Sequence, residues 1–225
     1  MSIAGINKAK IKKILISHWH GDHVSGLPGL IQTVGNIANK PQIEIYGPIN
    51  SKKMMKNMLN SCIFYNKVDI NVYEIVPAKL TKFYENQDYE LYAINLEHSV
   101  PCIGFKFVEK DTRKIDIVKA KKLGLKEGPD IGKLQNGKTI TIKGRKIKPN
   151  DVSIIKKGKS IAFILDTLAC NNGKILAKGA DILVSECVYA AGMEDKAKEH
   201  KHMTAPQVAK IAKQAKVKKL ILTHF

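Results

Sequence analysis

The sequence predicts an α/β protein (α+β), organised as a single domain over residues 1–225 with one inserted segment. Three observations support this class. Apolar runs of strand length alternate with runs of helical periodicity, several of the strand-like runs end at a histidine or an acidic residue, and no internal repeat is apparent. At 225 residues the chain is long enough to bury a substantial core.

The first half of the chain predicts five strands and two helices. The strand-like runs are either continuously apolar or alternate polar with apolar residues, as a half-buried strand does. We expect strands at 13–16, 41–46, 68–76, 89–96 and 101–108. Two helices are expected, over 24–36 and over the Met-rich run 49–62. Pro28 near the start and Gly35 near the end of the first helix are typical of helix boundaries.

The same apolar pattern resumes after residue 159. Strands are expected at 161–165, 181–185 and 219–223. The first of these ends at Asp166, the second at Glu186 and the third at His224. A helix is expected to begin at Thr204, because Thr204 and Gln207 have the spacing of a capping box.

Three of the seven histidines and one aspartate lie within six residues, directly after the first predicted strand. They are His18, His20, Asp22 and His23. Neutral imidazole and carboxylate oxygen are the ligands that zinc takes besides thiolate, and Gly21 permits a tight turn between them. A polar turn without function is the alternative, but four such groups at this density favour a divalent-metal site.

Three more groups of the same chemistry follow the ends of later predicted strands. They are His98, Asp166 and His224. In layered α/β proteins the carboxyl ends of strands are where sites are built, so we expect these groups to join the first cluster. One zinc ion needs three or four ligands. Seven nitrogen and oxygen ligands therefore suggest two metal ions that share a bridging carboxylate.

The chain is strongly basic, and much of the excess charge lies in one segment. Lys and Arg number 38 against 20 Asp and Glu, which gives a net charge of +18. Residues 109–159 contain 16 basic and six acidic residues, a net charge of +10. We interpret this segment as a protruding arm that contributes little to a core and binds a polyanion, with nucleic acid first. The alternative is a solvated insertion without function.

The cysteines and the apolar runs indicate the cellular compartment in which the protein is expected. Cys62, Cys102, Cys170 and Cys187 are scattered without a CxxC pair, which argues against a zinc ribbon or a disulfide framework and favours reduced thiols. No apolar run is long enough to cross a membrane, and the first residues lack the apolar stretch of a signal peptide. The sequence therefore predicts a cytoplasmic protein.

Several motifs together resemble the ribonuclease Z family of the metallo-β-lactamase superfamily. The HxHxDH motif at 18–23 identifies only the superfamily, whereas the run Gly26-Leu27-Pro28-Gly29-Leu30 and the Gly128-Pro129 pair are more specific. Further matches are His98-Ser99, Asp166-Thr167, Glu186, His202-Met203-Thr204 and His224. The resemblance implies an αββα sandwich and a zinc-dependent endoribonuclease that removes the 3′ trailer from precursor tRNA by two-metal phosphodiester hydrolysis.

The resemblance also implies roles for individual residues. One zinc ion would take His18, His20 and His98, and the second would take Asp22, His23 and His224, with Asp166 bridging the two. Asp22, Glu186 and His202 would be catalytic, with Asp22 orienting the water and the Glu–His pair beside the cleaved phosphate. The basic segment matches the family's exosite for tRNA, typically working across a homodimer. Its matching residues are Lys126, Gly128, Pro129 and Lys133.

The sequence departs from the family pattern at both ends. Seventeen residues precede His18, and the opening strands of the family are missing from them. The chain stops at Phe225, and Ser185 and Met203 replace common family residues beside the Glu–His pair. We therefore expect a fragment-like sandwich that lacks its N-terminal strands and exposes a sheet edge.

Two other functions stay open at this stage. The first is a hydrolase of the same fold that acts on a small phosphodiester, sulfate ester or thioester. The basic segment argues against it, because a small substrate has no use for so much added charge. The second is an inactive, truncated RNA-binding relic, which metal content and turnover would distinguish from an enzyme.

Overall fold

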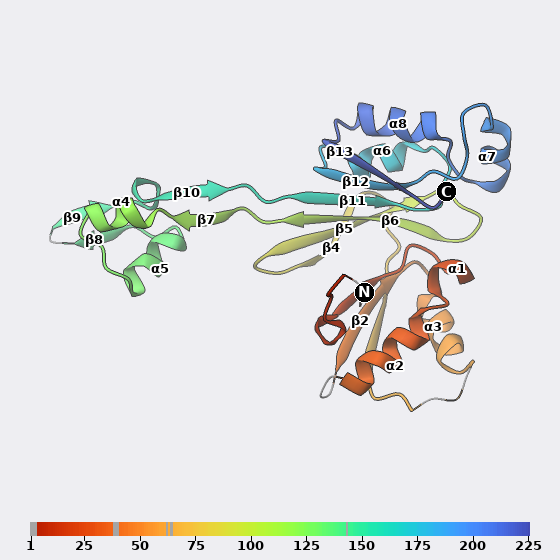
Figure 1. Ribbon diagram of the computed structural model, residues 1–225, viewed down its shortest axis with the longest axis horizontal. Helices are drawn as coiled ribbons and strands as arrows, with labels where there is room; N and C mark the ends of the chain where they lie inside the picture. Colours follow the sequence, from red (N-terminus) through yellow and green to blue (C-terminus); the bar gives the residue numbers. More distant parts are fainter. Residues whose placement is uncertain (1–3, 38–40, 62, 64, 143) are drawn as a thin grey trace. The chain divides into compact units, whose positions relative to one another are not determined.

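The computed structural model describes residues 4–37, 41–61, 63, 65–142 and 144–225. It divides into two compact units (Figure 1). The first unit comprises Met1–Glu85, Glu90–Phe107 and Ser160–Phe225. The second comprises Asn86–Tyr89 and Val108–Lys159.

The larger sheet of the first unit has six strands in the order β13-β12-β11-β6-β5-β4. Their bounds are Thr81–Glu85 (β4), Tyr89–Leu96 (β5), Cys102–Glu109 (β6), Ser160–Ile164 (β11), Ile182–Glu186 (β12) and Lys219–Thr223 (β13). Strands β11, β12 and β13 are parallel, with Ile164 opposite Ser185 and Ser185 opposite Leu222. The carboxyl ends of these three strands therefore lie at one edge.

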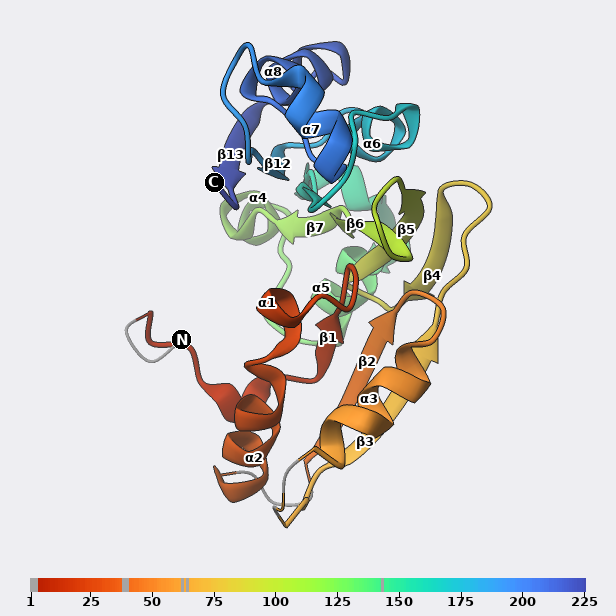
Figure 2. The same ribbon diagram turned by 90° about the vertical axis from the view of Figure 1, so that its right-hand side faces the viewer.

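The smaller sheet is parallel and has three strands, in the order β1-β2-β3. Its strands are Lys13–Leu15 (β1), Gln42–Gly47 (β2) and Asp69–Glu74 (β3), and the 3-10 turn η1 (Lys8–Lys10) precedes them. Helices α1 (Gly21–Val24), α2 (Leu27–Ile37) and α3 (Ser51–Leu59) connect them. Figure 2 shows α2 and α3 along one side of this sheet.

Three hydrophobic clusters hold the layers of the first unit together. Because side chains alternate along a strand, Ile43 and Ile45 of β2 pack towards α2 and α3 while Tyr46 faces the other way. Tyr46 belongs to the cluster that joins the two sheets, with Ile103 and Phe105 of β6. The opposite face of the larger sheet packs against α6 (Asn171–Ala177) and α8 (Ala205–Gln214). This helix–sheet–sheet–helix order confirms the αββα sandwich that was expected.

The second unit has secondary structure and a core of its own, whereas the sequence had indicated little capacity to fill a core. Its elements are β7 (Thr112–Ile115), α4 (Ile117–Lys122), α5 (Pro129–Gln135), β8 (Ile140–Ile142), β9 (Arg145–Ile147), the 3-10 turn η2 (Pro149–Asp151) and β10 (Ser153–Lys156). Strands β7 and β10 pair antiparallel, as do β8 and β9. Leu134, Ile147 and Val152 are buried in its small core, because widely spaced apolar residues converge when the segment folds back.

Most predicted elements of the first unit are present, with changed ends. The predicted helix over 24–36 begins later, at Leu27, because a separate short turn, α1, carries part of the histidine motif. Strand β4 was not predicted, since Thr81–Glu85 lacks a clean apolar alternation. Cys62 lies outside the described residues, and Cys102, Cys170 and Cys187 are free thiols as expected. Among the described helices, none has the length and apolar character needed to cross a bilayer.

Candidate metal centre

The first unit brings together all seven side chains that the sequence suggested as ligands. His18 follows β1, His98 follows β5, Asp166 follows β11 and His224 follows β13. Asp22 and His23 lie in α1, and His20 is its N-cap residue. Strand ends and one short helix thus converge on a single site.

The backbone is unusual at two of these positions. Asp166 has a φ of 30° and His224 has a φ of 56°, although neither residue is glycine. Left-handed backbone at such residues costs of order 1 kcal/mol or more and is typical of functional sites. Asp166 is separated from β11 by one residue and His224 stands directly after β13, so both left-handed positions lie at the carboxyl ends of parallel strands.

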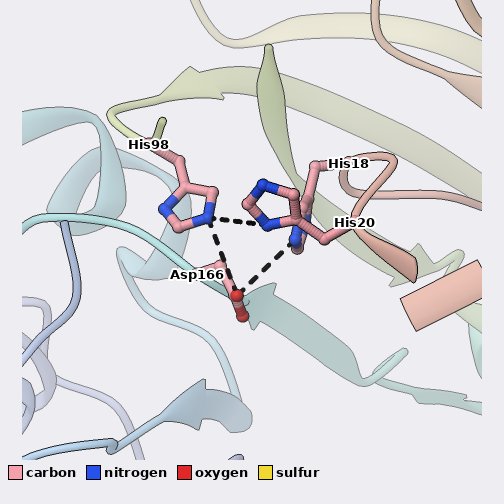
Figure 3. A group of neighbouring side chains, drawn as sticks. All are labelled: His18, His20, His98 and Asp166. Atoms are coloured by element: carbon pink, nitrogen blue, oxygen red, sulfur yellow. Dashed lines mark hydrogen bonds and ion pairs between the residues drawn. The ribbon is translucent and has the colours of Figure 1, made fainter. Parts of the chain in front are cut away.

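One group of ligands consists of His18, His20, His98 and Asp166 (Figure 3). The Nε2 atom of His98 lies 3.2 Å from Nδ1 of His20. Asp166 Oδ2 lies 3.5 Å from His18 Nε2 and 3.8 Å from His98 Nε2. One ligand atom from each of the four residues lies within 4.8 Å of the others, which is close enough for a single ion to contact all four.

A second group consists of Asp22, His23 and His224. Asp22 Oδ2 lies 3.3 Å from His23 Nε2 and 3.5 Å from His224 Nε2. The two imidazole Nε2 atoms are 3.2 Å apart. These three groups face a common point in the same way as the first four.

Asp166 lies between the two groups. Its Oδ2 atom is 3.3 Å from His23 Nε2, in addition to its contacts with the first group. Its Oδ1 atom is 3.7 Å from His224 Nε2. Because its carboxylate lies close to histidines of both groups, Asp166 is placed where a bridging ligand would lie.

Contacts outside the two groups orient the imidazole rings. The backbone carbonyl of Lys201 accepts a hydrogen bond from His98 Nδ1 at 3.0 Å, which leaves the Nε2 lone pair free for a cation. Ser17 Oγ is 3.0 Å from His18 Nδ1, and Ser99 Oγ is 3.4 Å from His20 Nε2. Sequence reasoning missed these contacts. Ser17 and Ser99 each adjoin a predicted ligand, which is the only sign of them in the sequence.

The electrostatics of the centre suit a divalent cation. Burial lowers the pKa of His18 to about 4 and also lowers that of His98, so both rings are neutral near pH 7. His18 Nε2 and Asp166 Oδ1 are buried without a hydrogen-bond partner among the described residues. Buried polar atoms that lack a hydrogen-bond partner are costly unless a cation satisfies them, so the donor set fits a metal ion.

Glu186 and His202 form a hydrogen-bonded pair beside the seven candidate ligands, which together we call the metal cluster. The buried Glu186 carboxylate accepts hydrogen bonds through Oε1 from His202 Nδ1 at 3.0 Å and from the Thr167 amide at 2.7 Å. Its Oε2 atom accepts one from the Met203 amide at 3.1 Å. Burial raises the pKa of Glu186, and these hydrogen bonds oppose that shift. The ring centroid of His202 lies 5.2 Å from that of His98.

The predicted RNA-binding residues all lie in the second unit. Gly128 has a φ of 152° as the N-cap residue of α5, a conformation that favours glycine, and Pro129 follows it. Lys133 Nζ donates to Asp130 Oδ1 at 2.9 Å, and Lys126 lines a cavity of about 320 Å³ beside α4. Their role in RNA binding stays a prediction.

Comparison with known proteins agrees with this fold and cluster. The profile of the metallo-β-lactamase superfamily matches residues 1–80. The chain is 40% identical to ribonuclease Z of Methanocaldococcus jannaschii over all of its own length and 72% of that protein. It is 39% identical to ribonuclease Z of Streptococcus agalactiae over 97% of its own length and 72% of that protein.

Solved structures lead to the same family. The crystal structure of the short form of human tRNase Z covers 98% of this chain and 74% of its own, with a TM-score of 0.67 and 26% identity. The metallo-β-lactamase fold protein YhfI from Bacillus subtilis covers 99% of this chain and 68% of its own, with a TM-score of 0.62 and 15% identity, so it shares the fold. With relatives this similar over the whole sequence, the chain belongs to the ribonuclease Z family of metal-dependent hydrolases.

Proposed function

We propose that the chain is an endoribonuclease that removes the 3′ trailer from precursor tRNA by metal-dependent hydrolysis of a phosphodiester. The observation that carries this proposal is the cluster of seven histidine and aspartate ligands with the Glu186–His202 pair directly beside it. A cation centre stabilises charge on a phosphate, and the adjoining pair supplies a proton, which together meet the needs of phosphodiester hydrolysis. The names of the relatives, ribonuclease Z and tRNase Z, support tRNA as the substrate.

The ligand set is suited to two zinc ions. His18, His20 and His98 would hold one, Asp22, His23 and His224 would hold the other, and Asp166 would contact both. Imidazole and carboxylate ligands without thiolates match the donor preference of zinc in hydrolases. When bound, the metal supplies Lewis acidity, which lowers the pKa of a water and offsets negative charge on the phosphate.

Protein side chains would perform the proton transfers. Asp22, whose side chain is largely exposed, would accept a hydrogen bond from the attacking water and orient it towards the phosphorus. His202 would donate a proton to the departing 3′ oxygen. The Glu186 carboxylate, fixed by two backbone amides, would keep the His202 ring in place.

The second unit would bind the body of the tRNA. Its segment 109–159 has a net charge of +10, and a polyanion is the partner that such a surface favours. Within it we propose Lys126, Gly128, Pro129 and Lys133 as RNA contacts. We further propose that the chain acts as a homodimer in the cytoplasm, in which the second unit of one subunit serves the tRNA on the other.

Cleavage of a defined transcript tests the proposal. The purified chain with added zinc should cut a precursor tRNA directly after the discriminator nucleotide, and sequencing of the product's 3′ end would locate the cut. The matched control is Asp166→Ala, which should retain the fold but not the activity. Hydrolysis of small phosphodiesters without any cleavage of tRNA would instead favour a small-substrate hydrolase. Tight RNA binding without turnover would favour an inactive RNA-binding protein.

A further inference from the structure

A cavity of about 580 Å³ lies in the first unit and is lined in part by His98, one of the seven candidate ligands. Its walls are mostly aliphatic and come from the loop after β2, the end of β3 and the loop between β5 and β6. The principal wall residues are Pro48, Ile49, Ile75, Val76, Val100 and Pro101. The volume is in the range of sites that hold small ligands, and none of the roles proposed above uses it.

The rim of this cavity exposes apolar side chains to solvent. Val76 is 68% exposed and Ile49 is 48% exposed. Exposed aliphatic groups gathered along one cavity are unfavourable in water and are typical of a surface that a ligand covers. The cavity therefore presents walls suited to a flat apolar face.

The cavity and the metal cluster share residues. His98 lines the cavity and is also one of the seven candidate ligands. The next residue, Ser99, lines the cavity and lies 3.4 Å from the His20 ring through its hydroxyl. Lys201 also lines it, and its ammonium group donates to the His98 carbonyl at 3.1 Å. A phosphate at the candidate ligands would therefore lie close to the cavity, and Lys201 would place a positive charge near it.

Hydrogen bonds hold one wall in place. The Glu97 amide donates to Thr167 Oγ1 at 3.0 Å, and the Leu168 amide donates to the Glu97 carbonyl at 2.8 Å. The Thr167 amide in turn donates to Glu186. The wall is thus pre-formed and tied to the residue that holds His202, so an occupant of the cavity would be fixed relative to the proposed proton donor.

We propose that this cavity binds the base of one nucleotide adjoining the cleaved phosphodiester. The inference rests on the proposed function, which places that phosphodiester at the metal cluster. Nucleic-acid enzymes that take a base out of the stack hold it between aromatic or apolar side chains, and the aliphatic walls offer apolar contacts of this kind. Ser99, Asn95 and Glu97 supply polar groups for the edges of the base. The occupant is either the discriminator base or the first base of the trailer.

A mutant cycle between the cavity and the substrate tests this inference. Wild type, Val76→Asn and Ile37→Asn would be assayed on the intact precursor and on precursors that lack the base at either position. Ile37 is the matched control, because it is 54% exposed at the end of α2 and does not line the cavity. For wild type we expect kcat/KM to fall about tenfold when one of the two bases is removed.

The variants give the decisive comparison. The kcat/KM of Val76→Asn should be several-fold below that of wild type on the intact precursor. It should fall little further on the precursor that lacks the bound base, while Ile37→Asn should have the kcat/KM values of wild type on every substrate. Two results would overturn the cavity assignment while leaving the proposed function intact. One is cleavage of both base-less precursors by wild type with unchanged kcat/KM, and the other is full additivity of the losses of kcat/KM from Val76→Asn and from base removal. Absence of cleavage of the intact precursor by wild type would overturn both.

Discussion

The Nδ1 atom of His202 lies 3.0 Å from Oε1 of Glu186, and Glu186 is fully buried. The same carboxylate holds two backbone amides, so it cannot rotate without losing hydrogen bonds. Replacement of His202 should therefore reduce the rate of cleavage more than replacement of Glu186 does. Removing the ring removes the proton donor, whereas altering the carboxylate changes only what holds that ring in position.

His202→Ala should lower kcat for precursor cleavage by about 10²-fold or more, the usual contribution of a positioned general acid. Glu186→Gln should lower kcat by about 10-fold to 100-fold, because the side-chain amide oxygen can still accept a hydrogen bond but the negative charge of the carboxylate is lost. Single-turnover cleavage at saturating enzyme measures both. Metal content, determined on the same samples, should not change. A Glu186→Gln variant with wild-type kcat would show that the pair has no catalytic role.

Asp22→Ala should abolish cleavage while leaving the affinity for tRNA nearly unchanged, because Asp22 lies at the cluster and not among the basic residues of the second unit. Filter binding and a cleavage assay on the same preparation make the comparison. Undiminished cleavage by this variant would contradict the proposed mechanism. Treatment with a chelator should remove activity from wild type, and about two zinc ions per chain should restore it.

Replacing residues 110–157 by Asn-Gly should weaken tRNA binding and reduce its dependence on salt, because phosphate contacts release counterions. The cut is feasible, since the Glu109 amide donates to the Lys159 carbonyl at 2.8 Å, and the three residues then left between them (Asn, Gly and Gly158) can form a tight turn between neighbouring strands. Hydrolysis of a small phosphodiester should continue at the wild-type rate, which serves as the control for folding. An unchanged tRNA affinity would rule out the second unit as the RNA-binding surface.

Gly104→Ala should lower the free energy of unfolding by about 1–3 kcal/mol, as overpacking in a core does. A Cβ atom at this position would lie 2.6 Å from Leu176 Cδ2 and 3.0 Å from Leu96 Cδ1, between β6 and α6. The matched control is Gly132→Ala in α5, where no atom lies within 4 Å and the helix should gain a few tenths of a kcal/mol to about 1 kcal/mol. Urea unfolding of the two variants distinguishes them by the sign of the change.

Asp181 should make stability depend on pH in the acid range. The Lys218 ammonium and the Ser160 amide hold the pKa of this carboxyl below its usual value. Its contribution is therefore fully present above the unfolded pKa of about 3.9 and is lost as pH falls through the lower folded pKa. Thermal melts in chelator should show Asp181→Asn less stable than wild type at pH 6 and the difference shrinking towards pH 3. A constant difference over that interval would contradict this assignment.

The convergence of the candidate ligands could be predicted because each of these groups follows an apolar run. His98, Asp166 and His224 are polar residues placed directly after strands, and strand ends meet at a sheet edge whatever the sequence in between. The αββα layers could be predicted from the resemblance to the family. Individual strands could be predicted only where the sequence showed a clear polar–apolar alternation or a continuous apolar run. Strand β4 shows neither.

The orientation of the side chains could not be predicted in the same way. The hydrogen bond from His98 to the Lys201 carbonyl joins residues more than one hundred positions apart and involves a backbone atom, which no residue type reveals. The core of the second unit was missed for a related reason. Leu134 and Val152 are isolated apolar residues in a basic stretch, and only the folded chain brings them together.

The candidate ligands also bear on how the two sheets stay together. His18, His20, Asp22 and His23 follow the smaller sheet, whereas His98, Asp166 and His224 follow the larger one, and the span from 18 to 224 covers almost the whole sequence. An unfolded chain cannot keep these groups within reach of one ion, so binding energy adds directly to folding energy. Bound metal would cross-link the two sheets, and the fraction of sites that hold metal would measure the fraction of molecules in which the sandwich is folded.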